Sequence, residues 1–212
     1  MMLKKLHFVV LTAIGLTSVL ATSISAQPEI TSDRLLAKAL KQGGYVIYFR
    51  HFQTSADYND QHTLTLGQCA TQRQLIAKGA AQAIDVREAF VKANIPVGSV
   101  LSSPFCRAWQ SADLAFGRHT VVDGLKLPPS KVYTDADKET MRTALLPLVS
   151  TPPEQGKNTI LVSHDDNIPT IGAPDVKNQG DAIIFKPLGN NKFEVVAELK
   201  VARWAKLARA SN

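Results

Sequence analysis

The sequence is short of three features: long apolar runs, clusters of basic residues and cysteines, of which it has 2. A membrane-spanning helix needs about 20 apolar residues in succession, and no segment after the first 26 residues approaches that. Without basic runs interleaved with aromatic residues, a nucleic-acid partner is not expected. Two cysteines alone give little support for a metal site. The 212 residues, 45% of them hydrophobic, suit one domain with a sizeable core.

Residues 1–26 have the layout of a secretory signal peptide. Lys4 and Lys5 form a short basic start, and an apolar stretch runs from Leu6 to Ile14, interrupted by His7 and Thr12. The segment ends in small residues, so cleavage is expected after Ala26. A membrane anchor is the alternative, but the apolar stretch is short and interrupted for a span.

Cleavage after Ala26 defines residues 27–212 as the folded domain and predicts a periplasmic or secreted protein without stable membrane insertion. The segment removed contains Lys4 and Lys5 and no acidic residue, so the formal charge changes from +6 to +6 − 2 = +4. This mild excess is spread along the chain. It fits a small anionic ligand better than a nucleic acid.

Cys69 and Cys106 both lie in the part of the chain expected to be exported. In an oxidising compartment an even pair is predicted to form a disulfide, with two free thiols as the alternative. The bridge would close a loop of about 37 residues, which contributes roughly 3–4 kcal/mol in the chain-entropy model.

The hydrophobic pattern predicts an α/β domain with strands alternating with helices around a largely parallel sheet. A run of apolar residues, Tyr45 to Phe49, predicts a strand that is buried on both faces. Further strands are predicted at 97–101 and 159–163, a hairpin at 182–186 and 193–199, and helices at 33–41, 71–94, 104–117, 134–149 and 201–210. Residues 52–68 are polar and long for a connection, which favours a functional loop.

Chemically useful side chains follow three of the predicted strands. Arg50-His51 ends the first, the segment Ser102 to Arg107 follows the second, and Ser163-His164 ends the third. Ligands of parallel sheets gather at the carboxyl ends of strands. Guanidinium forks bind phosphate oxygens, and a neutral imidazole is a competent nucleophile. Each residue alone has a structural or surface explanation, whereas their joint placement favours a phosphate site.

Three segments, 48–51, 101–112 and 161–164, resemble the signatures of the histidine phosphatase superfamily, the phosphoglycerate-mutase-like group. The segment 69–73 and Phe116-Gly117 are similar to an exported bacterial subgroup, whose cysteines coincide with those of this chain. The resemblance implies a three-layer α/β/α sandwich with a mostly parallel central sheet. It also implies a covalent phosphohistidine intermediate and requires no metal or cofactor.

Carried over by position, the resemblance gives each residue an expected role. His51 matches the nucleophile, Arg50 and Arg107 match the phosphate-binding arginines, and His164 matches the second histidine of the phosphate pocket. Arg73 matches less securely, either at the pocket rim or as a solvated helix residue.

The sequence departs from the family pattern beside both histidines. Phe52 stands where the family usually has glycine and is expected to narrow or reshape the mouth of the pocket. Asp165 also replaces a glycine and stands where the acid-phosphatase branch has its general acid, with a turn residue as the alternative. Residues 121–127 contain no glutamate for that role, which leaves Glu139 as a distant second choice.

These observations predict an exported phosphatase that hydrolyses small phosphate monoesters through a phosphohistidine on His51. A non-catalytic phosphate- or anion-binding protein and a protein-phosphohistidine phosphatase are the alternatives. The loop 52–68, with Tyr58 and His62, is expected to decide whether the pocket is closed or open and shallow. The sequence leaves the oligomeric state open.

Overall fold

The structure is a computed structural model that describes residues 30, 32–56, 60, 64–129 and 132–211. The predicted signal peptide, residues 1–26, lies outside the described residues, as do Tyr58 and His62. In the described ranges, no helix is both long enough and apolar enough to cross a membrane.

Within the described residues, the strands form one sheet in the order β3-β2-β4-β1-β5-β6. Their bounds are β1 Val46–Arg50, β2 Val97–Ser102, β3 Thr120–Val121, β4 Asn158–Ser163, β5 Ala182–Gly189 and β6 Lys192–Leu199. β1, β2, β3 and β4 pair in parallel, whereas β5 runs antiparallel to β1 and forms a hairpin with β6. The expectation of a mostly parallel sheet is confirmed.

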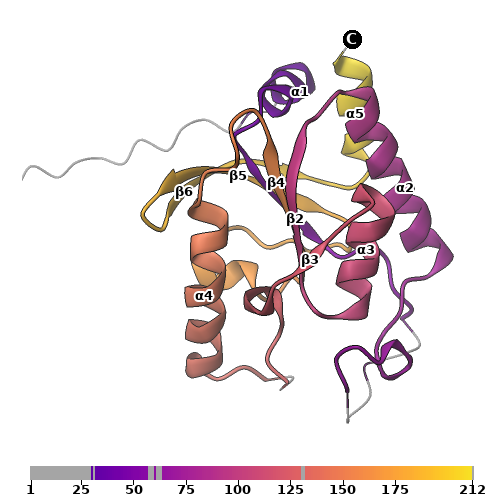
Figure 1. Cartoon of the computed structure of the whole chain (residues 1–212), viewed down its shortest axis with the longest axis vertical. Helices are drawn as coiled ribbons and strands as arrows, with labels where there is room; N and C mark the ends of the chain where they lie inside the picture. The colour runs from indigo at the N-terminus through magenta and orange to yellow at the C-terminus, as the bar shows by residue number, and fades with distance from the viewer. Residues whose placement is uncertain (1–29, 31, 57–59, 61–63, 130–131, 212) are drawn as a thin grey trace, which may run out of the picture.

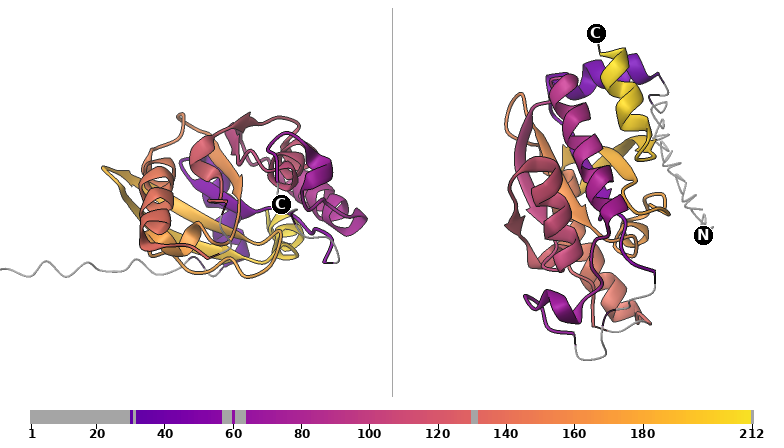
Figure 2. Two further views of the ribbon diagram at one scale, coloured as in Figure 1. Left: turned by 90° about the horizontal axis from the view of Figure 1, so that it is seen from below. Right: turned by 90° about the vertical axis from the view of Figure 1, so that its right-hand side faces the viewer.

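Helices cover both faces of the sheet (Figures 1 and 2). Their bounds are α1 Asp33–Gln42, α2 Ala77–Lys92, α3 Cys106–Phe116, α4 Asp135–Ser150 and α5 Arg203–Ala210. α1, α2, α3 and α5 share one core cluster with the sheet, and α4 packs on the opposite face with the short 3₁₀ helices η2 (Asp123–Leu125) and η3 (Ile168–Ile171). The three-layer α/β/α sandwich expected from the resemblance is therefore the observed fold.

The central strand β1 alternates its side chains between the two cores. Ile47 and Phe49 belong to the cluster under α2 and α5, while Val46 and Tyr48 belong to the cluster under α4. All four are 0% exposed, which is why the strand sequence is continuously apolar. Because both faces of β1 are closely packed, the carboxyl end of this strand at Arg50 is fixed in position.

Two details differ from the sequence-based expectation. The helix predicted to start at Thr71 begins at Ala77, because part of the preceding segment is extended and Leu75 pairs with Thr54 of the polar loop. The hydrophobic periodicity of the sequence does not reveal a pairing between residues this far apart. The short strand β3 carries no period that would have identified it, since it consists of two exposed residues beside β2.

A buried asparagine joins the elements at the amino edge of the sheet. The Oδ1 atom of Asn158 accepts from the Tyr45 N–H at 3.2 Å, and its Nδ2 donates to the carbonyls of Leu40 at 2.8 Å and Pro96 at 3.0 Å. These bonds connect the end of α1, the start of β1 and the approach to β2 through one fully buried side chain.

We expect Asn158→Ala to lower the free energy of unfolding by about 2–4 kcal/mol, because it leaves buried backbone groups without partners. Urea denaturation measures the loss. Gln42→Ala, at the exposed end of α1, serves as a control expected to change stability by less than about 0.5 kcal/mol. Equal stability of the two variants would contradict the role given to Asn158.

Candidate active site

The ends of three neighbouring strands meet at the carboxyl edge of the sheet. The His51 N–H donates to the Ser163 carbonyl at 2.9 Å, and the Ser103 N–H donates to the Val162 carbonyl at 3.0 Å, so strand pairing continues to the last residues. His51 and His164 consequently face each other edge to face, with ring centroids 5.6 Å apart. The structure brings together the two histidines that the sequence placed at separate strand ends.

The ring of His51 is held in one tautomer. Its Nδ1 lies 2.9 Å from the carbonyl oxygen of Phe52. Because a carbonyl only accepts, Nδ1 carries the proton in the neutral ring and Nε2 keeps its lone pair. The side chain is only 1% exposed, and its burial, together with the nearby positive charge of Arg107, lowers the pKa of His51 well below 6.5. His51 is therefore a neutral imidazole with an available Nε2 at physiological pH.

Arg73 reaches the nucleophilic face of this ring. Its Nη2 lies 3.5 Å from Nε2 of His51, and its positive charge also lowers the pKa of His51. Of the two expectations for Arg73, the structure agrees with a place in the pocket and not with a solvated helix residue, since Arg73 precedes the start of α2 at Ala77.

His164 is fixed from the opposite side. Its Nε2 lies 2.9 Å from Oγ of Ser103, and its ring packs edge to face on Phe105 with centroids 5.0 Å apart. Burial, with the charge of Arg107 as the next cause, lowers the pKa of His164 well below 6.5. Its buried Nδ1 has no hydrogen-bond partner among the described residues and is available to a ligand.

Arg107, in the first turn of α3, places a guanidinium beside both histidines. Its Cζ lies 4.5 Å from the centre of the Phe105 ring, and only 3% of its side chain is exposed. Burial lowers the pKa of Arg107 to about 10, so the group stays charged at neutral pH. A buried guanidinium requires an anionic partner.

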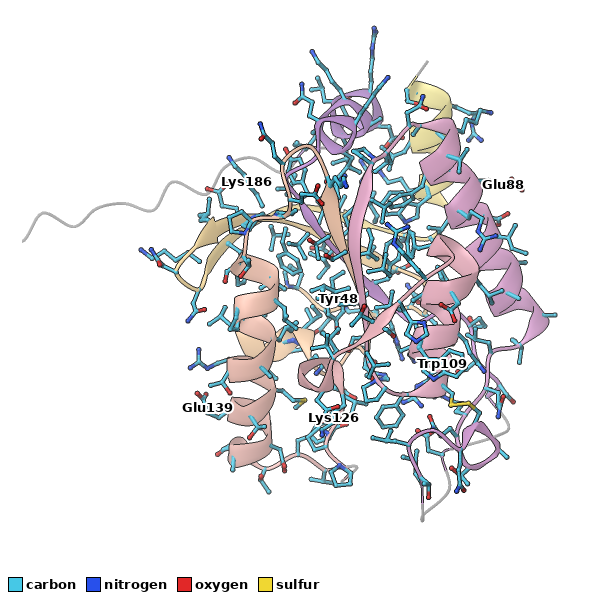
Figure 3. All side chains as sticks on the ribbon, in the orientation of Figure 1. Tyr48, Glu88, Trp109, Lys126, Glu139 and Lys186 are labelled. Carbon is cyan, nitrogen blue, oxygen red and sulfur yellow. A yellow bond between two sulfur atoms is a disulfide. The ribbon has the colours of Figure 1, made fainter. Side chains whose placement is uncertain are left out.

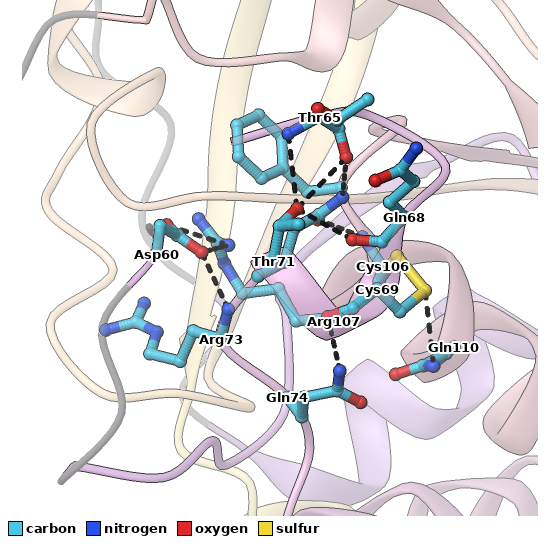
Figure 4. Close-up of a disulfide and its surroundings, with 12 residues drawn as sticks. Asp60, Thr65, Gln68, Cys69, Thr71, Arg73, Gln74, Cys106, Arg107 and Gln110 are labelled. Carbon is cyan, nitrogen blue, oxygen red and sulfur yellow. Dashed lines mark hydrogen bonds and ion pairs between the residues drawn. A yellow bond between two sulfur atoms is a disulfide. The ribbon is translucent and has the colours of Figure 1, made fainter. Parts of the chain in front are cut away.

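The anionic partner of Arg107 is Asp60, a residue that the sequence analysis missed. Its two carboxylate oxygens lie 3.0 and 3.2 Å from Nη1 of Arg107, and one of them accepts from the Arg73 N–H at 2.7 Å (Figure 4). No local pattern marks Asp60, because its partners are 13 and 47 residues away. A carboxylate thus occupies donors that suit a phosphate.

Arg50 has a different environment. Its Nη2 pairs with Oδ2 of Asp165 at 3.0 Å, and its Nη1 donates to the carbonyls of Lys177 at 2.5 Å and Val176 at 3.5 Å. Burial lowers the pKa of Arg50. Asp165 therefore faces the cluster.

Phe52 does not narrow the pocket mouth, and that expectation is wrong. The side chain is 0% exposed and packs in the core, with its ring centroid 6.1 Å from that of Phe49. The chain turns here because the Phe52 N–H donates to Oγ of Ser111 at 3.0 Å. The ring fits because Gly180 opposite has no side chain, and a Cβ there would lie 3.0 Å from the ring.

Glu139, the second choice for the general acid, lies away from the cluster. It sits on the outer side of α4, where its carboxylate pairs with Arg142 at 2.8 Å (Figure 3). The hydrogen bonds from Arg142 lower the pKa of Glu139, which opposes a role as proton donor.

The predicted disulfide between Cys69 and Cys106 is present, with a Cα–Cα distance of 5.6 Å. It joins the short 3₁₀ helix η1 (Cys69–Thr71), directly after the polar loop, to the first residue of α3, next to Arg107 (Figure 4). Gln72 strengthens the same connection, because its Oε1 accepts from the Cys106 N–H at 2.9 Å and its Nε2 donates to the Thr65 carbonyl at 3.1 Å. The bridge and Gln72 together hold the segment that carries Arg73.

The chemistry of the cluster suits an anion with several acceptor oxygens. The buried Nε atoms of Arg50, Arg73 and Arg107 have no hydrogen-bond partner within the described part of the chain. The residues that the structure describes contain no group of three or more His, Cys, Asp or Glu side chains arranged to hold a metal ion. Three guanidinium groups and two neutral imidazoles instead offer directed donors and one nucleophilic nitrogen.

Comparison with solved structures identifies the architecture. The protein histidine phosphatase SixA, solved with tungstate, superposes with a TM-score of 0.55 at 13% identity, covering 75% of this chain and 98% of its own. The chain has the fold of the histidine phosphatases. No protein-family profile matches the sequence, and no curated protein matches it either.

Two further phosphatases share this fold. A phosphoserine phosphatase from Entamoeba histolytica, in complex with 3-phosphoglyceric acid, has a TM-score of 0.52 at 15% identity over 74% of this chain and 96% of its own. A mycobacterial glucosyl-3-phosphoglycerate phosphatase with VO3 has a TM-score of 0.50 at 16% identity over 74% of this chain and 100% of its own. At these identities the likeness extends to the fold and not to the substrate.

We expect Asp60→Asn to bind orthovanadate about 10-fold more tightly, which corresponds to about 1.4 kcal/mol. The substitution removes a negative charge that competes with the ligand for Arg107. Competition calorimetry against inorganic phosphate measures the change. Asp85→Asn, on the exposed side of α2, is the matched control and is expected to leave affinity unchanged. Weaker binding by Asp60→Asn would contradict the competition.

The two buried histidines predict that acid destabilises the fold. The pKa values of His51 and His164 are lower in the folded protein than the ordinary 6.5, so the unfolded chain binds more protons below that pH. The free energy of unfolding should fall as the pH drops below about 6.5, by up to about 1.4 kcal/mol per unit for each histidine. Urea titrations between about pH 7.5 and 5 measure it, and His164→Gln should show about half the slope.

Proposed function

We propose that this protein hydrolyses small phosphate monoesters through a covalent phosphohistidine on His51. The observation that carries the proposal is the neutral His51 ring, with Nδ1 bound to a carbonyl and Nε2 beside Arg73. The fold shared with three phosphatases supports it. In the proposed reaction the chain's own side chains supply the nucleophile and the positive charge, and no metal or cofactor takes part.

The first half of the proposed reaction transfers the phosphoryl group to the enzyme. Arg50, Arg73 and Arg107 bind the phosphate oxygens, with His164 donating from its free nitrogen. Nε2 of His51 attacks phosphorus in line with the ester bond, the N–P bond forms and the P–O bond breaks. The guanidinium groups stabilise the charge spread over the equatorial oxygens. A carboxyl group at the mouth protonates the leaving oxygen, and Asp165 is the acid predicted from the sequence.

The second half regenerates the free enzyme. Water attacks the phosphohistidine, the O–P bond forms and the N–P bond breaks, which releases inorganic phosphate. The carboxylate that has lost its proton accepts one from the attacking water. The bond from Nδ1 of His51 to the Phe52 carbonyl keeps the ring oriented through both halves.

We further propose that the protein acts after export, in the periplasm or outside the cell. The Cys69–Cys106 bridge supports this, since disulfides persist in oxidising compartments. An obstructing Phe52 would have favoured the alternative of a non-catalytic anion-binding protein, but the side chain lies in the core. Protein phosphohistidine remains a second candidate substrate class, because one structure that shares the fold is a protein histidine phosphatase.

We expect the mature protein to hydrolyse phenyl phosphate and His51→Ala to lose turnover by about 1,000-fold or more. Quenching the wild-type reaction with radiolabelled substrate should trap phosphate on His51. His119→Ala, a histidine outside the cluster that pairs with Asp113, is the matched control.

Full activity of His51→Ala would contradict the assignment of the nucleophile. A wild-type protein that binds phosphate but neither turns over nor traps the label would instead be the non-catalytic binder. A phosphohistidine peptide as the alternative substrate separates the two substrate classes.

A further inference from the structure

Asp60, Asp165 and Asp166 lie near the arginine cluster, and their partners differ. Asp60 pairs with Arg107 at 3.0 Å, and Asp165 pairs with Arg50 at 3.0 Å. Asp166 instead accepts a hydrogen bond from a neutral group, the hydroxyl of Tyr133, at 3.3 Å. A guanidinium partner favours a charged carboxylate, whereas a general acid must carry a proton when the substrate binds.

We propose that Asp166, held by Tyr133, is the proton donor to the leaving oxygen, and that Asp165 serves to anchor Arg50. The inference rests on the proposed phosphatase reaction and deepens it. In the step, the proton on the Asp166 carboxyl moves to the ester oxygen as the P–O bond breaks. The alcohol departs and Asp166 is left ionised, ready to accept a proton from the attacking water.

The position of Asp166 suits this step. In an in-line displacement the leaving oxygen lies opposite the attacking nitrogen, so its proton donor must stand on the open side of the site, away from His51. His51 is 1% exposed, whereas Asp166 is exposed and follows directly after the pocket residues His164 and Asp165. Asp166 also lies near enough to Arg50 and Arg107 for their charges to act on it, so the proposal places the acid on the open side of the site.

Tyr133 is a positioning residue with a rigid attachment. It precedes the capping box of α4, in which the Asp137 N–H donates to Oγ1 of Thr134 at 3.2 Å and the Thr134 N–H donates to Asp137 Oδ2 at 2.9 Å. Burial and the charge of Asp166 raise the pKa of Tyr133, so its hydroxyl remains a donor. Because it binds one carboxyl oxygen of Asp166, the other is left to carry the proton.

Some groups around Asp166 raise its pKa and others lower it. Partial burial and the neighbouring charge of Asp165 raise the pKa of Asp166. The hydrogen bond from Tyr133 and the charges of Arg50 and Arg107 lower it, and the net change is upward. The result agrees with a carboxyl that holds its proton to higher pH than a free aspartate.

The leaving group provides the test. A dinitrophenolate departs without protonation, whereas phenolate needs more help from an acid. We expect Asp166→Asn to lower turnover of phenyl phosphate by about 100-fold or more and that of 2,4-dinitrophenyl phosphate by less than about 5-fold. Asp165→Asn should lower both rates by the same factor, and the exposed Asp135→Asn should change neither.

The pH profile tests Tyr133 separately. Tyr133→Phe removes a hydrogen bond that lowers the pKa of Asp166, so the alkaline limb of kcat for phenyl phosphate should move to higher pH. A merely structural contribution of Tyr133 would lower the rate without moving that limb.

The outcomes distinguish the identity of the acid from the proposed function as a whole. If Asp165→Asn, and not Asp166→Asn, discriminates between the two leaving groups, the acid is Asp165 and the inference is overturned. Equal loss on both substrates by Asp166→Asn also overturns it. In either case the trapped phosphohistidine in the wild-type enzyme keeps the proposed function, whereas failure to trap label with either substrate removes the function itself.

Discussion

The structure depends on gathering three guanidinium groups beside two buried imidazoles at one edge of the sheet. Like charges about 4 Å apart repel by about 4 kcal/mol at the effective dielectric near a protein surface. Arg50 and Arg107 each have an aspartate at 3.0 Å, and these two carboxylates offset part of the repulsion. Burial, with the positive charge of the arginines as a further cause, keeps both imidazoles neutral. In the proposed reaction, a phosphate dianion adds negative charge to this positively charged cluster.

Successive side chains of β1 point to opposite faces of the sheet, so the residues at its end face different helix layers. Tyr48 and Arg50 point toward the side of α4, whereas Phe49 and His51 point toward the side of α2 and α3. Accordingly Arg50 forms an ion pair with Asp165, in the turn after β4. His51 contacts Arg73, which precedes α2. Arg50, the last residue of the strand, and His51, directly after it, thereby face different partners. The geometry follows from burial of the strand on both faces, not from the loops.

The sequence predicted the features that depend on local pattern or on a fixed motif. The buried strand β1 and the disulfide are confirmed, and His51, Arg107 and His164 lie together in the structure. What it missed depends on contacts between distant segments. Asp60 is recognisable only through Arg107, and the inward turn of Phe52 requires a gap at Gly180. The sequence alone suggests that an aromatic residue after His51 obstructs the pocket, because the core that receives the ring is formed by distant segments.

The disulfide joins the two segments that carry Arg73 and Arg107. Cys69 lies on the segment that leads to Arg73, and Cys106 precedes Arg107 directly, so the bridge joins the carriers of two site guanidiniums. Arg73 lies outside any regular helix, and a residue in such a segment is otherwise free to turn toward water. The covalent link reduces that freedom before any ligand binds, which lowers the entropy lost on binding. Under the proposed export, the bridge therefore does more than stabilise the fold, because it preorganises the third arginine against His51.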